Sequence, residues 1–314
     1  LLLATLVVLL LPFLLVLAVV ADLAAGKRLA LTRALCALVL YLACEALGLL
    51  AAGLLWLAVG WWGPRQRFVD ANFRLQNLWA RTLLRGAIRL FGMRVRIEGA
   101  EALADGPILL FVRHASTIDT LLAANFVAPD RPFRLRYVIK RELLWDPCLD
   151  IVGQRIPNAF IRRGSGSGER EIEALRGLAR DLGGRDGVLI YPEGTRATAK
   201  KRAEALARIE AADAQRLARV AGLRCVLPPR YGGPLGLIEE RPDVDVVVLA
   251  HAGFDGVHDL GDLWRGALIG RELRLCFRRV AAADIPAGRA AREAWLDAEW
   301  RRVDDWVAAA TGVA

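Results

Sequence analysis

The chain has 314 residues, of which 55% are apolar, and a formal net charge of +9. This length suits one sizeable catalytic domain with a smaller addition, and the apolar share is above that of most soluble proteins, which predicts that part of the chain lies in lipid. The five cysteines lack the density and spacing of a disulfide scaffold and are expected to be reduced, and with only three histidines no metal site is expected.

Two long apolar runs occupy the start of the chain. Residues 1–20 carry no charge, and residues 34–62 carry only that of Glu45. A bilayer span needs about 20 apolar residues, and the first run lacks the basic start of a signal peptide. We therefore expect residues 1–63 to form an uncleaved membrane helical pair. Because an ionisable group inside a span is costly, Glu45 is expected to be neutral or paired with a neighbouring helix.

Arginines crowd the segment that follows. Under the positive-inside rule they favour a domain on the cytoplasmic side of an inner membrane, and with the net charge they indicate anionic lipids, not nucleic acid, as partners. Apolar residues recur among them at helical spacing, so residues 64–92 are expected to form an amphipathic helix. That helix either lies in the headgroup layer or packs on the domain with a solvated basic face, and the two are compatible. The arginines are Arg65, Arg67, Arg74, Arg81, Arg85 and Arg89.

Residues 93–314 alternate short β-prone runs with helical stretches. This alternation predicts an α/β domain with a mixed β-sheet flanked by helices. The expected strands are residues 93–98, 107–112, 136–139, 159–161, 188–191 and 244–250; the expected helices are residues 120–127, 169–182, 198–221 and 289–310.

A histidine and an aspartate lie five residues apart where the second of these strands ends. His114 and Asp119 would be about 140° apart on a regular helix, but a turn entering the helix can bring them together. Asp119 would then hold the imidazole in the tautomer whose other nitrogen is a base. Such a pair without a serine suits direct attack by a substrate hydroxyl on a thioester. Without such a turn, His114 is an ordinary half-buried histidine and Asp119 a carboxylate near a helix start.

A second polar group follows the strand at residues 188–191. Here Glu193, Gly194, Thr195 and Arg196 form a turn, in which Arg196 could bind a phosphate bidentately and Gly194 allows a close approach of backbone N–H groups to an anion. Glu193 is expected to orient Arg196 or to contact glycerol hydroxyls. The alternative is a surface turn with a local ion pair. Because the two groups follow core strands, we expect them to share one cleft.

The order and spacing of these two motifs resemble those of the glycerolipid acyltransferase family, which includes 1-acylglycerol-3-phosphate acyltransferases. The resemblance covers roughly residues 97–254 and includes three further blocks: Lys140-Arg-Glu-Leu143, Asn158-Ala-Phe-Ile-Arg-Arg163 and Cys225-Val-Leu-Pro-Pro-Arg230.

The resemblance implies a function and roles for named residues. His114 and Asp119 would be catalytic, and Arg163 and Arg196 would bind the substrate phosphate, with Lys140, Glu193, Gly194 and Thr195 beside them. The reaction expected is acyl transfer from acyl-CoA or acyl carrier protein to the sn-2 hydroxyl of lysophosphatidic acid, with no cofactor. Donors near Gly194 and Thr195 would stabilise the oxyanion.

Two other functions remain open. The helical segment at residues 200–221 resembles an insertion found in relatives that act on lysocardiolipin and other lysophospholipids such as lysophosphatidylglycerol, which favours a remodelling acyltransferase. A non-catalytic scaffold that binds anionic headgroups is an alternative from another class.

Three further polar residues, Arg113, His251 and His258, have no assigned role in this scheme. The family often has Asn before the catalytic histidine, whereas Arg113 stands here, either lowering the pKa of His114 or facing the headgroups. His251 and His258 are expected to be solvated loop residues, with a place at the acyl-donor entrance as the alternative.

Overall fold

The computed structural model describes residues 2–127, 133–161, 168–257 and 259–313. Three long helices come first: α1 (Leu2–Ala24), α2 (Ala30–Leu55), which continues as the π-helix η1 (Trp56–Gly60), and α3 (Arg65–Phe91). The strands are β1 (Arg94–Glu98), β2 (Ile108–Val112), β3 (Arg134–Lys140), β4 (Ala159–Ile161), β5 (Asp186–Ile190), β6 (Asp245–Ala252) and β7 (Glu272–Val280). Between and after them lie η2 (Ala100–Leu103), η3 (Ile118–Leu121), α4 (Leu122–Phe126), η4 (Arg141–Trp145), α5 (Pro147–Gly153), α6 (Gly168–Ala179), α7 (Ala199–Ala212), α8 (Ala214–Val220), α9 (Gly232–Glu240), α10 (Leu260–Trp264), η5 (Ala282–Asp284) and α11 (Arg289–Thr311).

The seven strands form one mixed sheet in the order β1-β7-β6-β2-β5-β3-β4. Strands β6, β2, β5, β3 and β4 run parallel, β7 is antiparallel to β6, and β1 is parallel to β7. The predicted α/β fold with a mixed sheet flanked by helices is confirmed. Strand β7 was not predicted, although burial largely alternates along it, as expected for a strand with one face on the core.

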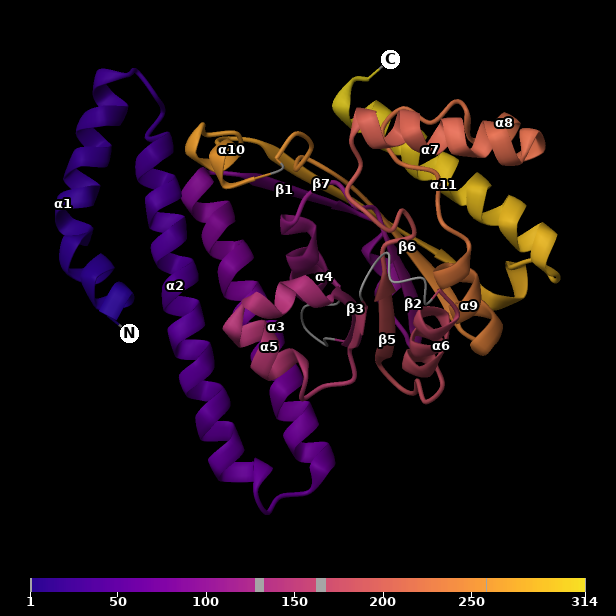
Figure 1. Ribbon diagram of the computed structural model, residues 1–314, viewed down its shortest axis with the longest axis horizontal. Coiled ribbons are helices and arrows are strands. Elements are labelled where there is room, and N and C mark those ends of the chain that lie inside the picture. Colours follow the sequence, from indigo (N-terminus) through magenta and orange to yellow (C-terminus); the bar gives the residue numbers. More distant parts are fainter. Residues whose placement is uncertain (1, 128–132, 162–167, 258, 314) are drawn as a thin grey trace.

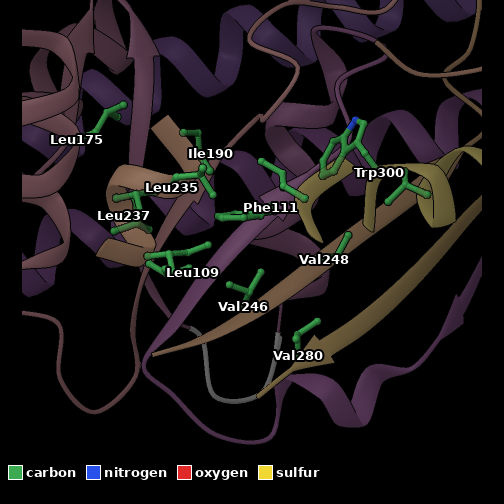
Figure 2. Packing of buried hydrophobic residues seen from close by; sticks show 14 of the residues in the cluster. Leu109, Phe111, Leu175, Ile190, Leu235, Leu237, Val246, Val248, Val280 and Trp300 are labelled. Atoms are coloured by element: carbon green, nitrogen blue, oxygen red, sulfur yellow. The ribbon is translucent and has the colours of Figure 1, made fainter. Parts of the chain in front are cut away.

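Helices cover both faces of the sheet, and the central strands supply side chains to each (Figure 1). In β2, Leu109 and Phe111 point to the face covered by α6, α9 and α11, where Trp300 of α11 is fully buried (Figure 2). The alternate residues of the same strand, Leu110 among them, belong to the second core, which includes Leu84 of α3. A strand buried on both faces is held rigidly, so the residues that follow it are held in fixed positions.

Helix α2 lies alongside α1, at the side of the molecule (Figure 1). Of the helices in the described part of the chain, the continuous stretch Ala30–Gly60 is long and apolar enough to cross a membrane, with a mean hydropathy of 2.2, and Leu10–Ala24 is a shorter apolar stretch. Leucines of α2 and the two tryptophans after η1 have exposed apolar side chains, which are Leu47, Leu50, Leu54, Trp61 and Trp62.

Glu45 is buried and paired at the contact between α2 and α5. Its carboxylate accepts hydrogen bonds from the indole N–H of Trp79 at 2.9 Å and from the backbone N–H of Cys148 at 3.1 Å. Of the two expectations for Glu45, the structure shows pairing, with Trp79 of α3 and with the first turn of α5. The apolar helix α2 is thereby joined to the rest of the fold.

Helix α3 packs on the domain and keeps a basic outer face. Its Leu84 is fully buried, and its Asp70 forms an ion pair with Arg134 of β3 at 3.0 Å. The exposed arginines are Arg65, Arg67, Arg74, Arg85 and Arg89. Of the two compatible expectations for residues 64–92, packing on the domain is therefore observed.

The single helix expected at residues 198–221 is two helices. Asp213 separates α7 from α8 and accepts a hydrogen bond from the backbone N–H of Arg216 at 2.9 Å, which caps the start of α8. The break has no glycine or proline to mark it in the sequence, and an aspartate cap was its only signal.

Candidate active site

The predicted polar groups meet at one edge of the sheet. Because β2, β3, β5 and β6 are parallel, their carboxyl ends lie at this edge. His114 follows β2, the turn at Glu193–Arg196 follows β5, and Lys140 ends β3. The carboxyl ends of strands are where open α/β sheets bind ligands.

His114 and Asp119 contact each other through the turn that leads into η3. The Nδ1 atom of His114 lies 3.2 Å from Oδ2 of Asp119, whose carboxylate also accepts hydrogen bonds from the backbone N–H groups of Ala115 at 2.6 Å and Ser116 at 2.8 Å. The Asp119 side chain is fully buried, whereas the imidazole keeps 14% of its surface exposed. A tight turn and a 3₁₀ turn replace the regular helix that would have held the two groups apart.

Asp119 is ionised and acts as the acceptor in this pair. Burial alone would raise its pKa, but the hydrogen bonds from His114 and His251 outweigh that effect and hold the pKa of Asp119 well below its usual range. The Nδ1 atom of His114 therefore carries the proton that faces Asp119. Its Nε2 atom is left free to accept a proton from another molecule.

Tyr191 supports the His114 imidazole from the end of β5. The two ring centroids lie 4.3 Å apart with the planes tilted by 30°. Burial, followed by the negative charge of Asp119, raises the pKa of Tyr191 well above its usual value, so the ring remains neutral. A neutral aromatic face stacked on the imidazole restricts its rotation.

Glu193 holds the backbone of the site and does not reach its surface. Its side chain is buried, Oε1 accepts a hydrogen bond from the backbone N–H of His114 at 2.8 Å, and Oε2 accepts one from Leu227 at 2.9 Å. Burial raises the pKa of Glu193 to about 8, although these two donors and the charge of Arg113 act in the opposite direction. In place of the expected contact with Arg196 or with glycerol hydroxyls, Glu193 therefore binds the backbone N–H groups of His114 and Leu227.

Gly194 adopts a backbone conformation that disfavours other residues. Its φ is +70°, and a Cβ atom there would lie 2.8 Å from Cδ of Arg230. The backbone N–H of Gly194 donates to the carbonyl of Tyr191 at 2.8 Å and is not a free oxyanion donor. The Thr195 hydroxyl accepts from Nζ of Lys201 at 2.9 Å, which leaves its own O–H to donate.

Substituting Gly194 by alanine should destabilise the fold by about 1–3 kcal/mol, because alanine is strained at positive φ and Arg230 must move. Gly177→Ala is the matched control, since Gly177 lies inside α6 with no atom within 4 Å of an added Cβ, and it should be neutral or stabilise by up to about 1 kcal/mol. Urea unfolding of both variants tests this, and equal shifts in midpoint would contradict it.

Arg196 lies against the turn that holds the histidine. Its guanidinium donates to the Thr117 hydroxyl at 3.0 Å, and the backbone N–H of the next residue, Ala197, donates to the His114 carbonyl at 2.8 Å. The structure thus brings a cation to the same turn as the His114–Asp119 pair.

The positions of Lys140 and Arg163 differ from that of Arg196. Lys140 is exposed at the end of β3, where its Nζ atom lies 4.0 Å from Oε2 of Glu142. Strand β5 separates β3 from β2 in the sheet. Arg163 follows β4 but lies outside the described residues.

The structure corrects the expectation for His251 and excludes one of the two alternatives for Arg113. His251 is fully buried within β6 and lies 3.5 Å from Oδ2 of Asp119, so it is not a solvated loop residue. Arg113 is also buried and forms an ion pair with Asp255 at 2.5 Å, so it does not face headgroups. His258 lies outside the part of the chain that the structure describes.

Comparison with known proteins finds a family match for the part of the chain that holds both motifs. Residues 94–223 match the model of the Acyltransferase family. The chain is also similar in structure to the 1-acyl-sn-glycerophosphate (LPA) acyltransferase PlsC from Thermotoga maritima, with a TM-score of 0.54, 16% identity, and coverage of 87% of this chain and 97% of that one. No curated protein sequence matches the chain.

These matches confirm the family that the motifs indicated. The family model runs from β1 to just past the end of α8, and so includes both motifs. The two motifs that meet at one edge of the sheet therefore both lie in the region that matches the family. Arg230 adds a guanidinium beside Gly194 that sequence reasoning left out of the site, although its block was part of the resemblance.

Proposed function

We propose that this acyltransferase moves a fatty acyl group from a thioester, acyl-CoA or acyl carrier protein, to the sn-2 hydroxyl of lysophosphatidic acid, giving phosphatidic acid. One observation carries the proposal: the Arg196 guanidinium is bonded to Thr117, within the turn that pairs His114 with Asp119. An acceptor phosphate held by Arg196 would bring a hydroxyl of the same small molecule to the base.

In the proposed reaction, the acceptor hydroxyl gives its proton to Nε2 of His114 while its oxygen attacks the thioester carbonyl carbon. Asp119 orients the imidazole and stabilises the imidazolium that forms. The tetrahedral intermediate then expels the thiolate, which takes the proton from His114. The Thr195 hydroxyl is the donor we assign to the oxyanion, and one such donor is worth about 3 kcal/mol.

The phosphate is proposed to lie between arginines from two loops. Arg196 and Arg230 both flank Gly194, the first by sequence and the second by contact. Among the described residues no carboxylate pairs with Arg230, so its charge is not already neutralised. Lys140, which ends β3, and Arg163, which comes after β4 in the sequence, are proposed to bind the headgroup as well.

Membrane lipids are the proposed partners, and the proposed location is the cytoplasmic side of an inner membrane. The exposed leucines of α2 and the tryptophans after η1 suit the apolar and interfacial layers, and the arginines of α3 suit anionic headgroups. A lysolipid acceptor could then be used without leaving the bilayer.

A second acceptor class is favoured by the helices that follow Arg196. Lys201 of α7 donates to the Thr195 hydroxyl and to the Arg196 carbonyl, so the insertion formed by α7 and α8 touches the proposed phosphate site. A remodelling acyltransferase for lysocardiolipin or lysophosphatidylglycerol would use the same chemistry on a larger headgroup. Comparing these acceptors with lysophosphatidic acid separates the two activities.

Replacing Arg196 by alanine should raise the KM for lysophosphatidic acid roughly 10- to 100-fold, because a charge-assisted hydrogen bond is worth about 1.5–3 kcal/mol. The KM for the thioester should change less than twofold. Arg208→Ala, which removes an exposed arginine from α7, is the control and should change neither constant. Equal effects of Arg196→Ala on donor and acceptor would contradict phosphate recognition.

A further inference from the structure

His251 is buried next to the turn at residues 114–119, which holds the His114–Asp119 pair. It belongs to β6, which pairs with β2, and the backbone N–H of Arg113 donates to the Leu249 carbonyl at 3.1 Å as the two strands end. The side chain of His251 has no exposed surface. A residue so placed cannot touch either substrate, so any effect it has on the reaction must pass through its neighbours.

The Nε2 atom of His251 faces two acceptors. It lies 2.9 Å from the backbone carbonyl of Arg113 and 3.5 Å from Oδ2 of Asp119. A carbonyl oxygen can only accept, so Nε2 must carry the hydrogen. The other ring nitrogen, Nδ1, is buried without a hydrogen-bond partner in the described part of the chain, which fits an unprotonated atom because a buried N–H without an acceptor is costly.

Arg113 makes the reciprocal contact, because its side chain binds the backbone of His251. Its guanidinium donates to the backbone carbonyl of His251 at 2.7 Å and to that of Cys225 at 3.0 Å. Asp255 neutralises its charge at 2.5 Å. The side chains of Arg113 and His251 thus each bind the backbone carbonyl of the other residue. These two hydrogen bonds connect the end of β2 to the end of β6.

We propose that His251 is a positioning residue, whose single Nε2–H fixes both the peptide that precedes His114 and the carboxylate that orients the His114 imidazole. The inference rests on the proposed function, since it concerns the geometry of the base in acyl transfer. A displacement of about 1 Å at a catalytic group can cost roughly 10²-fold in rate. Losing the Nε2–H should therefore lower kcat and leave both KM values unchanged.

Three substitutions at one position test this proposal. His251→Leu removes the donor. His251→Gln places an amide N–H about as far from the backbone as Nε2, and His251→Asn places one closer, where Nδ1 lies. We expect kcat to fall 10- to 100-fold for leucine and asparagine and less than fivefold for glutamine, with KM for donor and acceptor within twofold of the wild type.

Folding of each variant is checked by circular dichroism and thermal unfolding. If the leucine variant does not fold, the comparison of glutamine with asparagine decides, because both are polar and buried at the same place. Equal kcat for glutamine and asparagine, wild-type kcat for leucine, or an effect confined to KM would each overturn the proposal.

A spectroscopic measurement separates this proposal from the proposed function. With three histidines in the chain, the ¹⁵N imidazole signals of the wild type can be assigned through the variants. His251 should show the neutral Nε2–H tautomer at pH 7 whether or not acyl transfer is detected, and a protonated Nδ1 would overturn the positioning role. Absence of acyl transfer by the wild type with every acceptor would overturn the proposed function alone.

Discussion

Replacing His114 by alanine should lower acyl transfer by about 10²–10⁴-fold or abolish it, because a positioned general base contributes on that order. The imidazole is partly exposed and stacked on Tyr191, so the fold should remain intact. The rate of ester formation from a labelled thioester measures the effect.

Membrane attachment is the control for the His114 variant. The apolar helices and the basic face of α3 do not depend on the imidazole, so co-sedimentation with anionic vesicles should equal that of the wild type. Unchanged ester formation by the variant would favour the non-catalytic scaffold. Loss of attachment together with activity would indicate a structural role for His114.

Asp119→Asn should reduce kcat by about 10²–10⁴-fold and also destabilise the fold. Asparagine cannot hold the imidazole in the same tautomer, and its NH₂ group would face N–H donors of the turn. An unsatisfied buried group costs about 1–3 kcal/mol. Urea unfolding gives the stability change, and Asp243→Asn is the control, since the Asp243 side chain is 64% exposed in a surface ion pair.

The stability effect of Asp119→Asn should depend on pH in a defined direction. The pKa of Asp119 is below its usual range in the folded state, so its ionised carboxylate stabilises the protein above the unfolded-state pKa of about 3.9. That contribution is lost as the pH falls toward the folded pKa. The difference between wild type and variant should be full at pH 6 and smaller at pH 3, and a difference that grows on acidification would contradict the assignment.

The edge of the sheet that carries the site was predictable from local signals. Apolar runs gave the parallel strands, and polar residues directly after two of them gave the positions of His114 and Arg196. Because carboxyl ends of parallel strands share an edge, the meeting of the two motifs followed from topology. The structure confirms the fold, and it shows His114 in contact with Asp119 and Arg196 in contact with their turn.

The residues that hold the site from behind were not predictable. Glu193 had the sequence context of a surface turn, yet it is buried, and two backbone N–H groups from distant segments donate to its carboxyl group. His251 follows an apolar run at residues 244–250 and precedes a Gly/Asp-rich stretch, so nothing local showed that β6 continues through it. Such roles depend on long-range pairing of β2 with β6, which a single sequence does not display.

The most direct test of the central claim is an assay of purified protein in mixed micelles with a labelled acyl thioester and lysophosphatidic acid. Monoacylglycerol, which lacks the phosphate, serves as the matched acceptor. We predict labelled phosphatidic acid, formed at a kcat/KM at least tenfold above that for monoacylglycerol. Equal use of the two acceptors, or no ester with any lysophospholipid, would contradict the claim that His114 and Asp119 act on a hydroxyl held by its phosphate at Arg196.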